Sequence, residues 1–249
     1  MNKLTWITNI LACLMIVLAA VGALCGAAVT LATDIDLYCG MSRMAVMDTL
    51  GARDALDVSS QTTAYIGITD MEQHIFAEET VRFMKGETDA QPEILNEKER
   101  QHMLDVRALV NLAQKVSKGC MTVAAAFAVI IAWTGAREKR RGMPAGTLVG
   151  VGLIALGVFG VYAMLNAQGF EALFVRFHEL LFTNDLWLMN PETDILIRMM
   201  PQLLFVRAGQ ELVRLALQSF LITDILLMLV YMLVGGMIRR QLTEGKEAK

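Results

Sequence analysis

The stretch ILACLMIVLAAVGALCGAAVTLA, residues 10–32, contains 23 residues and no charged side chain. A helix needs roughly 17–25 mainly apolar residues to cross the hydrocarbon part of a bilayer. The stretch meets this requirement, and it is longer than the apolar segment of a cleavable signal peptide. We therefore expect a membrane helix that is retained in the mature chain.

Three further apolar runs follow along the chain. Residues 119–136 and 142–170 contain no charged side chain, and residues 215–238 contain one, Asp224. Over the whole chain, 55% of residues are hydrophobic and 19% are charged, against about 25% charged in a typical soluble domain. The pattern predicts an all-α membrane protein with four transmembrane helices.

The distribution of charge predicts the orientation in the membrane. The segments that include both termini and the short second connection hold 9 Lys and Arg against 3 Asp and Glu; the two longer connections hold 13 against 21. Because Lys and Arg accumulate on the cytoplasmic side, we expect both termini to be cytoplasmic. The expected segments are transmembrane helices at 10–32, 119–136, 145–165 and 215–238, extracellular cap parts at 33–118 and 166–214, a cytoplasmic basic loop at 137–144 and a cytoplasmic tail at 239–249.

The first outer connection is too long to be a simple linker and is expected to fold. Apolar residues recur at three- to four-residue steps over residues 59–85, which predicts a helix. Asn96 followed by Glu99 is typical of a capping box, in which each residue hydrogen-bonds the backbone of the other. We expect a second helix to begin there and to run unbroken into the membrane.

The second outer connection shows a similar division. Residues 170–182 have helical spacing, and residues 183–189 are irregular. Asn190-Pro191-Glu192 combines a capping residue, a proline suited to the first helical position and an acid, and so predicts a helix start. The two connections together predict a helical extracellular cap.

Small residues in the apolar runs indicate close helix packing. Gly22 and Gly26, and likewise Gly146 and Gly150, have the four-residue spacing that lets membrane helices approach each other. Cys39 and Cys120 fall near the outer ends of expected membrane helices, where a disulfide is possible. We favour two unpaired cysteines over that disulfide.

His102 is a candidate catalytic residue. Glu99 and Asp105 lie three residues to either side, so that on a helix both can face the imidazole. A carboxylate bonded to one ring nitrogen fixes the tautomer and raises basicity. The alternative is a solvated charged helix face. His74 lies in a polar helix and is expected to be an ordinary surface residue.

His178 is the second candidate. It opens the sequence HELLF, which starts like the zinc-protease pattern H-E-x-x-H but has Phe182 in place of the second histidine. Phe177 and Trp187 add further aromatic side chains, and Asn184 and Asp185 follow shortly after. From spacing alone, a catalytic histidine and a histidine satisfied in the protein core remain equally open.

Two stretches together carry a resemblance to a known family. NEKERQHMLDVRALV (96–110) and FHELLFTNDLWLMNPETDILIRMMP (177–201) resemble the motifs of the lipoprotein intramolecular transacylases of Gram-positive bacteria. Leu181 departs from the pattern, which has an aromatic residue there. The resemblance extends to the expected four membrane helices with an extracellular cap.

The resemblance implies an activity and a site. The family moves the sn-2 acyl chain of a lipoprotein's diacylglyceryl group to the α-amine of the lipoprotein's N-terminal cysteine, and forms a lyso-form lipoprotein. Its two catalytic histidines correspond to His102 and His178. The expected partners are diacylglyceryl-modified lipoproteins and membrane lipids, and neither a metal nor a cofactor is required. The other expected site residues are Asp105, Asn184 and Asp185 as supporting groups and Phe177, Phe182 and Trp187 as substrate-binding groups.

Two other classes of function remain open at this point. Asp224, an acid within an apolar run, is compatible with a non-enzymatic membrane protein such as a transporter subunit or a receptor-like cap. His102, His178, Asp105 and Asp185 together are compatible with a metal-dependent membrane hydrolase.

Overall fold

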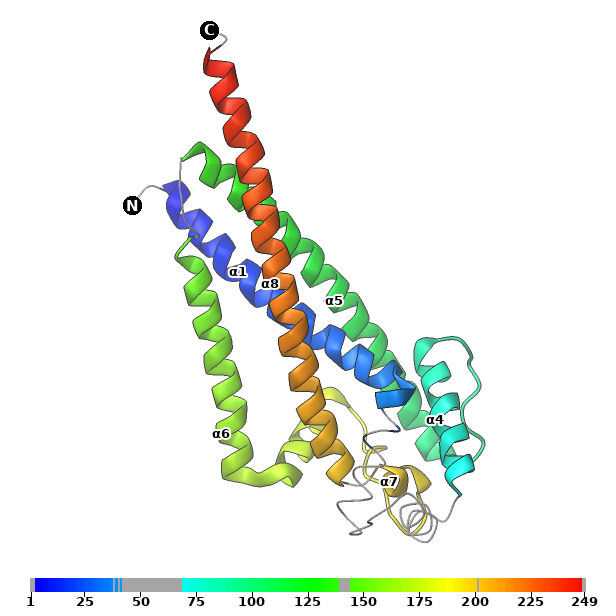
Figure 1. The fold of residues 1–249 in the computed structure, drawn as a ribbon. Helices are drawn as coiled ribbons and strands as arrows, with labels where there is room; N and C mark the ends of the chain where they lie inside the picture. Colours follow the sequence, from blue (N-terminus) through cyan, green and yellow to red (C-terminus); the bar gives the residue numbers. More distant parts are fainter. Residues whose placement is uncertain are drawn as a thin grey trace. The chain divides into compact units, whose positions relative to one another are not determined.

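The computed structural model describes residues 3–37, 39, 41, 69–138, 144–200 and 202–247. Throughout these ranges the regular elements are helices, which confirms the predicted all-α class (Figure 1). Residues 59–68 of the helix predicted at 59–85, and Pro201, lie outside the described residues. The helices are α1 (Lys3–Thr33), α4 (Asp70–Lys85), α5 (Glu97–Arg137), α6 (Gly146–Leu181), α7 (Ile195–Met199) and α8 (Gln202–Glu247).

Three of the described helices are long and apolar enough to cross a membrane. They are α1, α5 and the Gln202–Glu244 part of α8. The span predicted at 145–165 falls on a shorter apolar stretch of α6, Gly146–Gly160. The protein is therefore a multi-pass membrane protein by its helices, and the number of four spans stays a prediction.

The chain divides into two compact units, which we describe separately. The bundle unit comprises Met1–Gly26, Gln114–Ala167 and Leu215–Lys249. The histidine unit comprises Ala27–Ala113 and Gln168–Arg214, and contains both candidate histidines.

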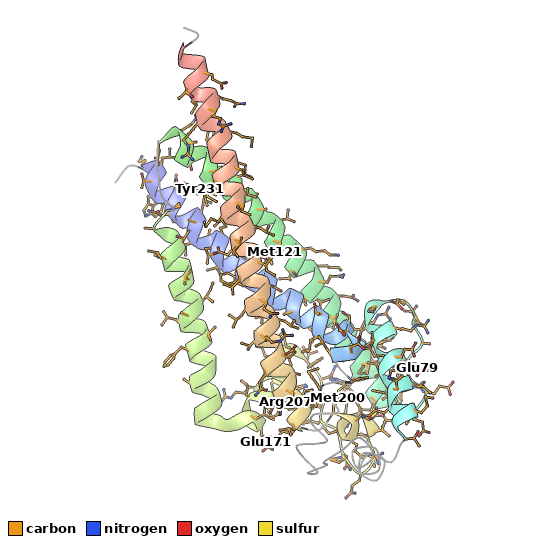
Figure 2. The ribbon with its side chains drawn as sticks, in the orientation of Figure 1. Glu79, Met121, Glu171, Met200, Arg207 and Tyr231 are labelled. Atoms are coloured by element: carbon orange, nitrogen blue, oxygen red, sulfur yellow. The ribbon has the colours of Figure 1, made fainter. Side chains whose placement is uncertain are left out.

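Four of the eight buried residues described in the core of the bundle unit are alanines. Ala12 and Ala19 of α1 and Ala124 and Ala128 of α5 are at most 1% exposed. Larger residues complete this core, among them Leu227 of α8. Met121 and Tyr231 of this unit are labelled in Figure 2.

The predicted close approach at glycine is confirmed within the bundle unit. A Cβ atom added to Gly22 would lie 3.1 Å from Cε of Met121, and one added to Gly146 would lie 1.8 Å from the carbonyl oxygen of Asn9. The Ser117 hydroxyl also donates a hydrogen bond of 2.8 Å to the Gly22 carbonyl. The glycines are therefore needed for helix contact.

Capping residues define the first helices of the histidine unit. Thr69 and Glu72 form a capping box at the start of α4, and Gly86 ends that helix at a positive φ of 78°. Asn96 and Glu99 form the predicted box at the start of α5: the Asn96 amide donates to Glu99 (2.8 Å), and the Glu99 amide donates to the Asn96 side chain (3.0 Å). The helix that begins at this box continues without a break, as predicted, and ends at Arg137.

Large apolar side chains form the core of the histidine unit. They come from α4, α5, α7 and the turn before α5, and Met200, labelled in Figure 2, packs against them. The buried set is Phe76, Phe83, Met84, Leu95, Met103, Ile195, Leu196 and Met199.

Two local features differ from or add to the sequence predictions. The helix start predicted at Asn190 is wrong: the side chain of Asn190 accepts from the Glu192 amide in a turn, and α7 begins at Ile195. The reason is that the Asn190 carbonyl closes this turn by accepting from the Thr193 and Asp194 amides.

At Gly169 the backbone leaves the helical region, with φ 79° and ψ 173°, so α6 breaks there before the predicted helical stretch that begins at Phe170.

Candidate active site

His102 lies in the second turn of α5, before the apolar part of that helix. Its side chain is 7% exposed. The Nδ1 atom is buried and has no hydrogen-bond partner among the described residues. A buried polar atom without a partner is uncommon in proteins.

His178 lies on the part of α6 that follows the break at Gly169. Its side chain is 8% exposed, and its Nδ1 atom lies 2.7 Å from the carbonyl oxygen of Phe174, one helical turn earlier. Because a carbonyl oxygen can only accept, Nδ1 carries the proton in this contact. Nε2 of the neutral ring therefore has a free lone pair.

The structure brings these two histidines together. Their ring centroids are 6.3 Å apart, with 29° between the ring planes. The ring of Phe182 contacts both, at 5.1 Å from His102 and 5.6 Å from His178. Phe182, which stands where the zinc-protease pattern has its second histidine, is thus the aromatic neighbour of the pair.

Further aromatic rings surround His178. Phe174 lies at 4.1 Å, Trp187 at 4.9 Å and Phe177 at 5.4 Å between ring centroids. Trp187 is buried, whereas Phe177 is 54% exposed. The predicted substrate-binding residues Phe177, Phe182 and Trp187 therefore all contact His178, although their contact with a substrate stays a prediction.

Burial keeps both imidazoles neutral. Burial lowers the pKa of His102 to about 4; His178 and Lys98 lower it as well, while the Asp105 carboxylate opposes them. Burial also lowers the pKa of His178, and its bond to Phe174 opposes that effect. Since the ordinary histidine pKa is near 6.5, both rings are uncharged at neutral pH.

The polar residues expected to support His178 make other contacts. The Asn184 side-chain amide donates to Asp105 (2.9 Å), and the Leu186 amide donates to the Asn184 side-chain oxygen (3.1 Å). The Asp185 side chain is exposed and has no hydrogen bond to a described residue. Neither Asn184 nor Asp185 hydrogen-bonds His178 in this structure, where Nδ1 of His178 bonds the Phe174 carbonyl, and their supporting role stays a prediction.

From the sequence, Glu99 can face His102, but its carboxylate bonds backbone amides instead. One carboxylate oxygen accepts from the Asn96 amide and the other from the Leu196 amide, at 2.7 Å. Sequence reasoning therefore missed two contributors to the site, the Phe174 carbonyl and Lys98. Phe174 precedes His178 by one helical turn, which is a signal that the sequence does contain.

The remaining candidates lie apart from this pair. His74 is exposed on α4, and its Nδ1 atom lies 3.9 Å from the sulfur of Cys39. No disulfide joins Cys39 to Cys120, as favoured from the sequence. Across the described ranges, no three His, Cys, Asp or Glu side chains are grouped so as to hold a metal ion.

Two neutral imidazoles in an aromatic surrounding, in a chain with membrane-spanning helices, define a candidate membrane enzyme that uses general acid–base catalysis. The family described as "Lipoprotein intramolecular transacylase Lit" matches residues 7–205. Because this match covers most of the chain, the protein belongs to that family, which is a family of acyltransferases.

Solved structures share the fold. The membrane integral lipoprotein intramolecular transacylase Lit from Bacillus cereus superposes with a TM-score of 0.62 at 21% identity, over 92% of this chain and 97% of that one. A variant of the same B. cereus protein, with a histidine replaced by arginine, gives a TM-score of 0.60 at 18% identity, over 98% and 95%. A comparison with curated proteins found no significant match.

Proposed function

We propose that this protein moves the acyl chain from the sn-2 position of a lipoprotein's diacylglyceryl group to the α-amine of that lipoprotein's N-terminal cysteine. The observation that carries the proposal is the pair His102 and His178, buried and neutral with ring centroids 6.3 Å apart. Membership in the transacylase family supplies the class of substrate.

The reaction balances within one substrate molecule. A C–N amide bond forms, the C–O ester bond at the sn-2 position breaks, the amine loses a proton and the glyceryl oxygen gains one. An α-amine has a pKa near 7.7–8.0, so a base is needed to keep the attacking nitrogen neutral. The leaving oxygen needs an acid, and the two imidazoles can supply both groups.

The tautomer of His178 supports the role of base for this residue in the proposal. Its Nδ1–H is committed to the Phe174 carbonyl, so Nε2 is the atom that accepts the amine proton. The same carbonyl stabilises the imidazolium that then forms. His102, held neutral, relays the amine proton: it accepts the proton from the His178 imidazolium and passes it to the leaving glyceryl oxygen, so that both imidazoles end uncharged. Acid–base catalysis of this kind contributes about 10²–10⁴-fold.

The aromatic side chains supply confinement in this proposal. Phe177, Phe182 and Trp187 contact the His178 ring and would contact the glyceryl and acyl groups of the substrate. Holding the amine against the ester makes the attack intramolecular, and effective molarities in such cases reach about 10⁵–10⁸ M. Asp105 is the carboxylate that favours a proton on His102.

The proposed topology places both termini in the cytoplasm and the histidine unit outside the cell. The uneven distribution of Lys and Arg supports it, with the spans at 10–32, 119–136, 145–165 and 215–238. Single cysteines in a cysteine-free background test it: Gln91→Cys and Glu192→Cys should react with an impermeant maleimide from outside, and Glu138→Cys should not.

Mass spectrometry of lipoprotein N-terminal peptides tests the activity. Expression of the wild-type chain in a bacterium with diacylglyceryl lipoproteins should give N-acyl, S-monoacyl peptides. His102→Ala and His178→Ala should each abolish this product at normal protein level, while His74→Ala, the matched control, keeps it. Unchanged lipopeptides with a folded wild-type protein would reject the proposal.

A further inference from the structure

The segment 184–196 is tied to helix α5 at two places, one on each side of His102. At one end, Asn184 donates to Asp105, which follows His102 by three residues. At the other end, the contacts go to Asn96, Lys98 and Glu99, which precede it. The helix that carries His102 therefore also holds the segment that carries Trp187.

Lys98 and Asp194 are central to the contacts that precede His102. The Lys98 ammonium donates to the Leu188 carbonyl and lies 3.3 Å from the Asp194 carboxylate. The Asn96 side chain donates to the same carboxylate at 2.9 Å, and the Asn190 amide donates at 2.8 Å. One ammonium group thus joins two points of the segment, six residues apart, to α5.

The burial of Asp194 shows that these contacts are built into the unit. Asp194 is 4% exposed, and a buried carboxylate is costly unless it is paired and hydrogen-bonded. Although burial favours its protonated form, its hydrogen bonds and Lys98 keep the pKa of Asp194 below its usual value. Lys98 itself is 37% exposed, so its ion pair alone adds little stability.

Trp187 lies between the two attachments. It directly precedes Leu188, whose carbonyl Lys98 binds, and its ring stacks on His178 at 4.9 Å with 29° between the planes. A shift of Leu188 therefore moves the indole that lies on the catalytic imidazole. The Lys98 contact thus lies directly beside Trp187 in the chain.

We propose that Lys98 and Asp194 are positioning residues: they hold segment 184–196 on the helix that carries His102, and so keep Trp187 stacked on His178. Neither touches the reacting atoms in this assignment. A misplacement of about 1 Å in an active site can lower the rate about 10²-fold, so loss of this attachment lowers turnover more than it lowers stability.

Lys98→Met is the main test, because methionine removes the ammonium and keeps an apolar stem. Arg100→Met is the matched control: Arg100 lies on the same turn and donates to the Leu95 and Glu93 carbonyls, which are outside segment 184–196. Lys98→Arg tests rescue, and Asp194→Asn removes the same ion pair from the segment side. The chain has three tryptophans. All variants also carry Trp6→Phe and Trp133→Phe, so that the tryptophan fluorescence comes from Trp187 alone.

The readouts are kcat and KM for a synthetic diacyl lipopeptide, the melting temperature, and the emission maximum and acrylamide quenching of Trp187 well below that temperature. We expect Lys98→Met and Asp194→Asn to lower kcat about tenfold or more, to shift the emission to the red and to increase quenching. Lys98→Arg should restore most of the wild-type kcat and of the wild-type Trp187 fluorescence. Arg100→Met should change only the melting temperature.

Wild-type kcat and unchanged Trp187 emission in Lys98→Met would overturn the inference, as would equal losses in Arg100→Met. The turnover readout rests on the proposed function, whereas the Trp187 readout does not. If the wild-type protein lacks transacylase activity, the proposed function fails, and the emission of Trp187 still decides whether Lys98 and Asp194 position it.

Discussion

The cores of the bundle unit and the histidine unit differ in composition. Four of the eight residues in the bundle core are alanines, Ala12, Ala19, Ala124 and Ala128, all nearly unexposed, whereas the buried cluster of the histidine unit consists of phenylalanine, methionine, leucine and isoleucine. Lipid is as apolar as a side chain, so membrane helices associate through close approach at small residues. The large apolar side chains of the histidine unit stabilise it through the apolar area that they bury.

The two units also differ in the polar side chains that they bury. In the described part of the bundle unit, Thr8 and Thr134 are buried, and each hydroxyl donates to a carbonyl of its own helix. The histidine unit buries two carboxylates and two imidazoles: Glu99, Asp194, His102 and His178. Among the buried residues that the structure describes, the ionisable side chains therefore all lie in the histidine unit.

The largest effect is expected when a closely packed glycine of the bundle unit is replaced by alanine. We expect Gly146→Ala to lower the yield of folded protein severely, because the new Cβ would lie 1.8 Å from the Asn9 carbonyl oxygen. Overpacking usually costs about 1–3 kcal/mol and occasionally more, and a clash with backbone belongs at the upper end. Size-exclusion yield in detergent and thermal unfolding measure the effect.

Gly152→Ala is the control for this change. A Cβ there meets nothing within 4 Å, and alanine favours a helix over glycine by about 1 kcal/mol. If Gly146→Ala were as stable as Gly152→Ala, close approach at glycine would not hold the bundle together.

The reverse change, from large to small, should damage the histidine unit. Phe76 is 2% exposed in its core, so Phe76→Ala should cost about 3–5 kcal/mol through lost burial and the cavity it leaves. The adjacent Ile75 is 46% exposed, and Ile75→Ala should cost far less. Thermal unfolding compares the two, and equal losses would show that this cluster is not the stabilising core.

The buried imidazoles should make stability depend on pH. The pKa of His102 is about 4 in the folded protein and near 6.5 in an unfolded chain. The unfolded state therefore binds more protons between these values, and stability is lost as pH falls from about 6.5 towards 4, by on the order of 3 kcal/mol. Melting temperatures of the wild type and His102→Gln across this range measure it; parallel curves would contradict a neutral, buried His102.

Local signals allowed much of the histidine unit to be predicted from the sequence. The capping box at Asn96 and Glu99 depends on residues three apart, and it forms as predicted. The Asn190 turn was misread because a capping asparagine and a turn asparagine use the same side-chain oxygen. Whether a helix follows depends on residues farther along the chain.

Contacts between distant residues were the part that the sequence could not supply. The carboxylate of Glu99 bonds the Leu196 amide, and Asn184 bonds Asp105; neither pairing follows from periodicity or spacing. The pairing of His102 with His178 was predicted only through the family resemblance. A single chain shows which residues can share a helix face, but not which distant segment packs there.

The smallest expected effect is that of Asp185→Asn, which we compare with a change at the neighbouring Asn184. Asp185 is exposed, and its carboxylate makes no hydrogen bond to a described residue; Asp185→Asn should therefore keep turnover within about twofold, since asparagine also suits a turn. Asn184→Ala removes the bond to Asp105, a loss of about 1 kcal/mol, and should lower turnover several-fold because that bond is one of the two attachments of segment 184–196. Assays of purified enzyme with a synthetic diacyl lipopeptide compare the two. A strong loss in Asp185→Asn at unchanged melting temperature would instead assign a catalytic role to that exposed carboxylate.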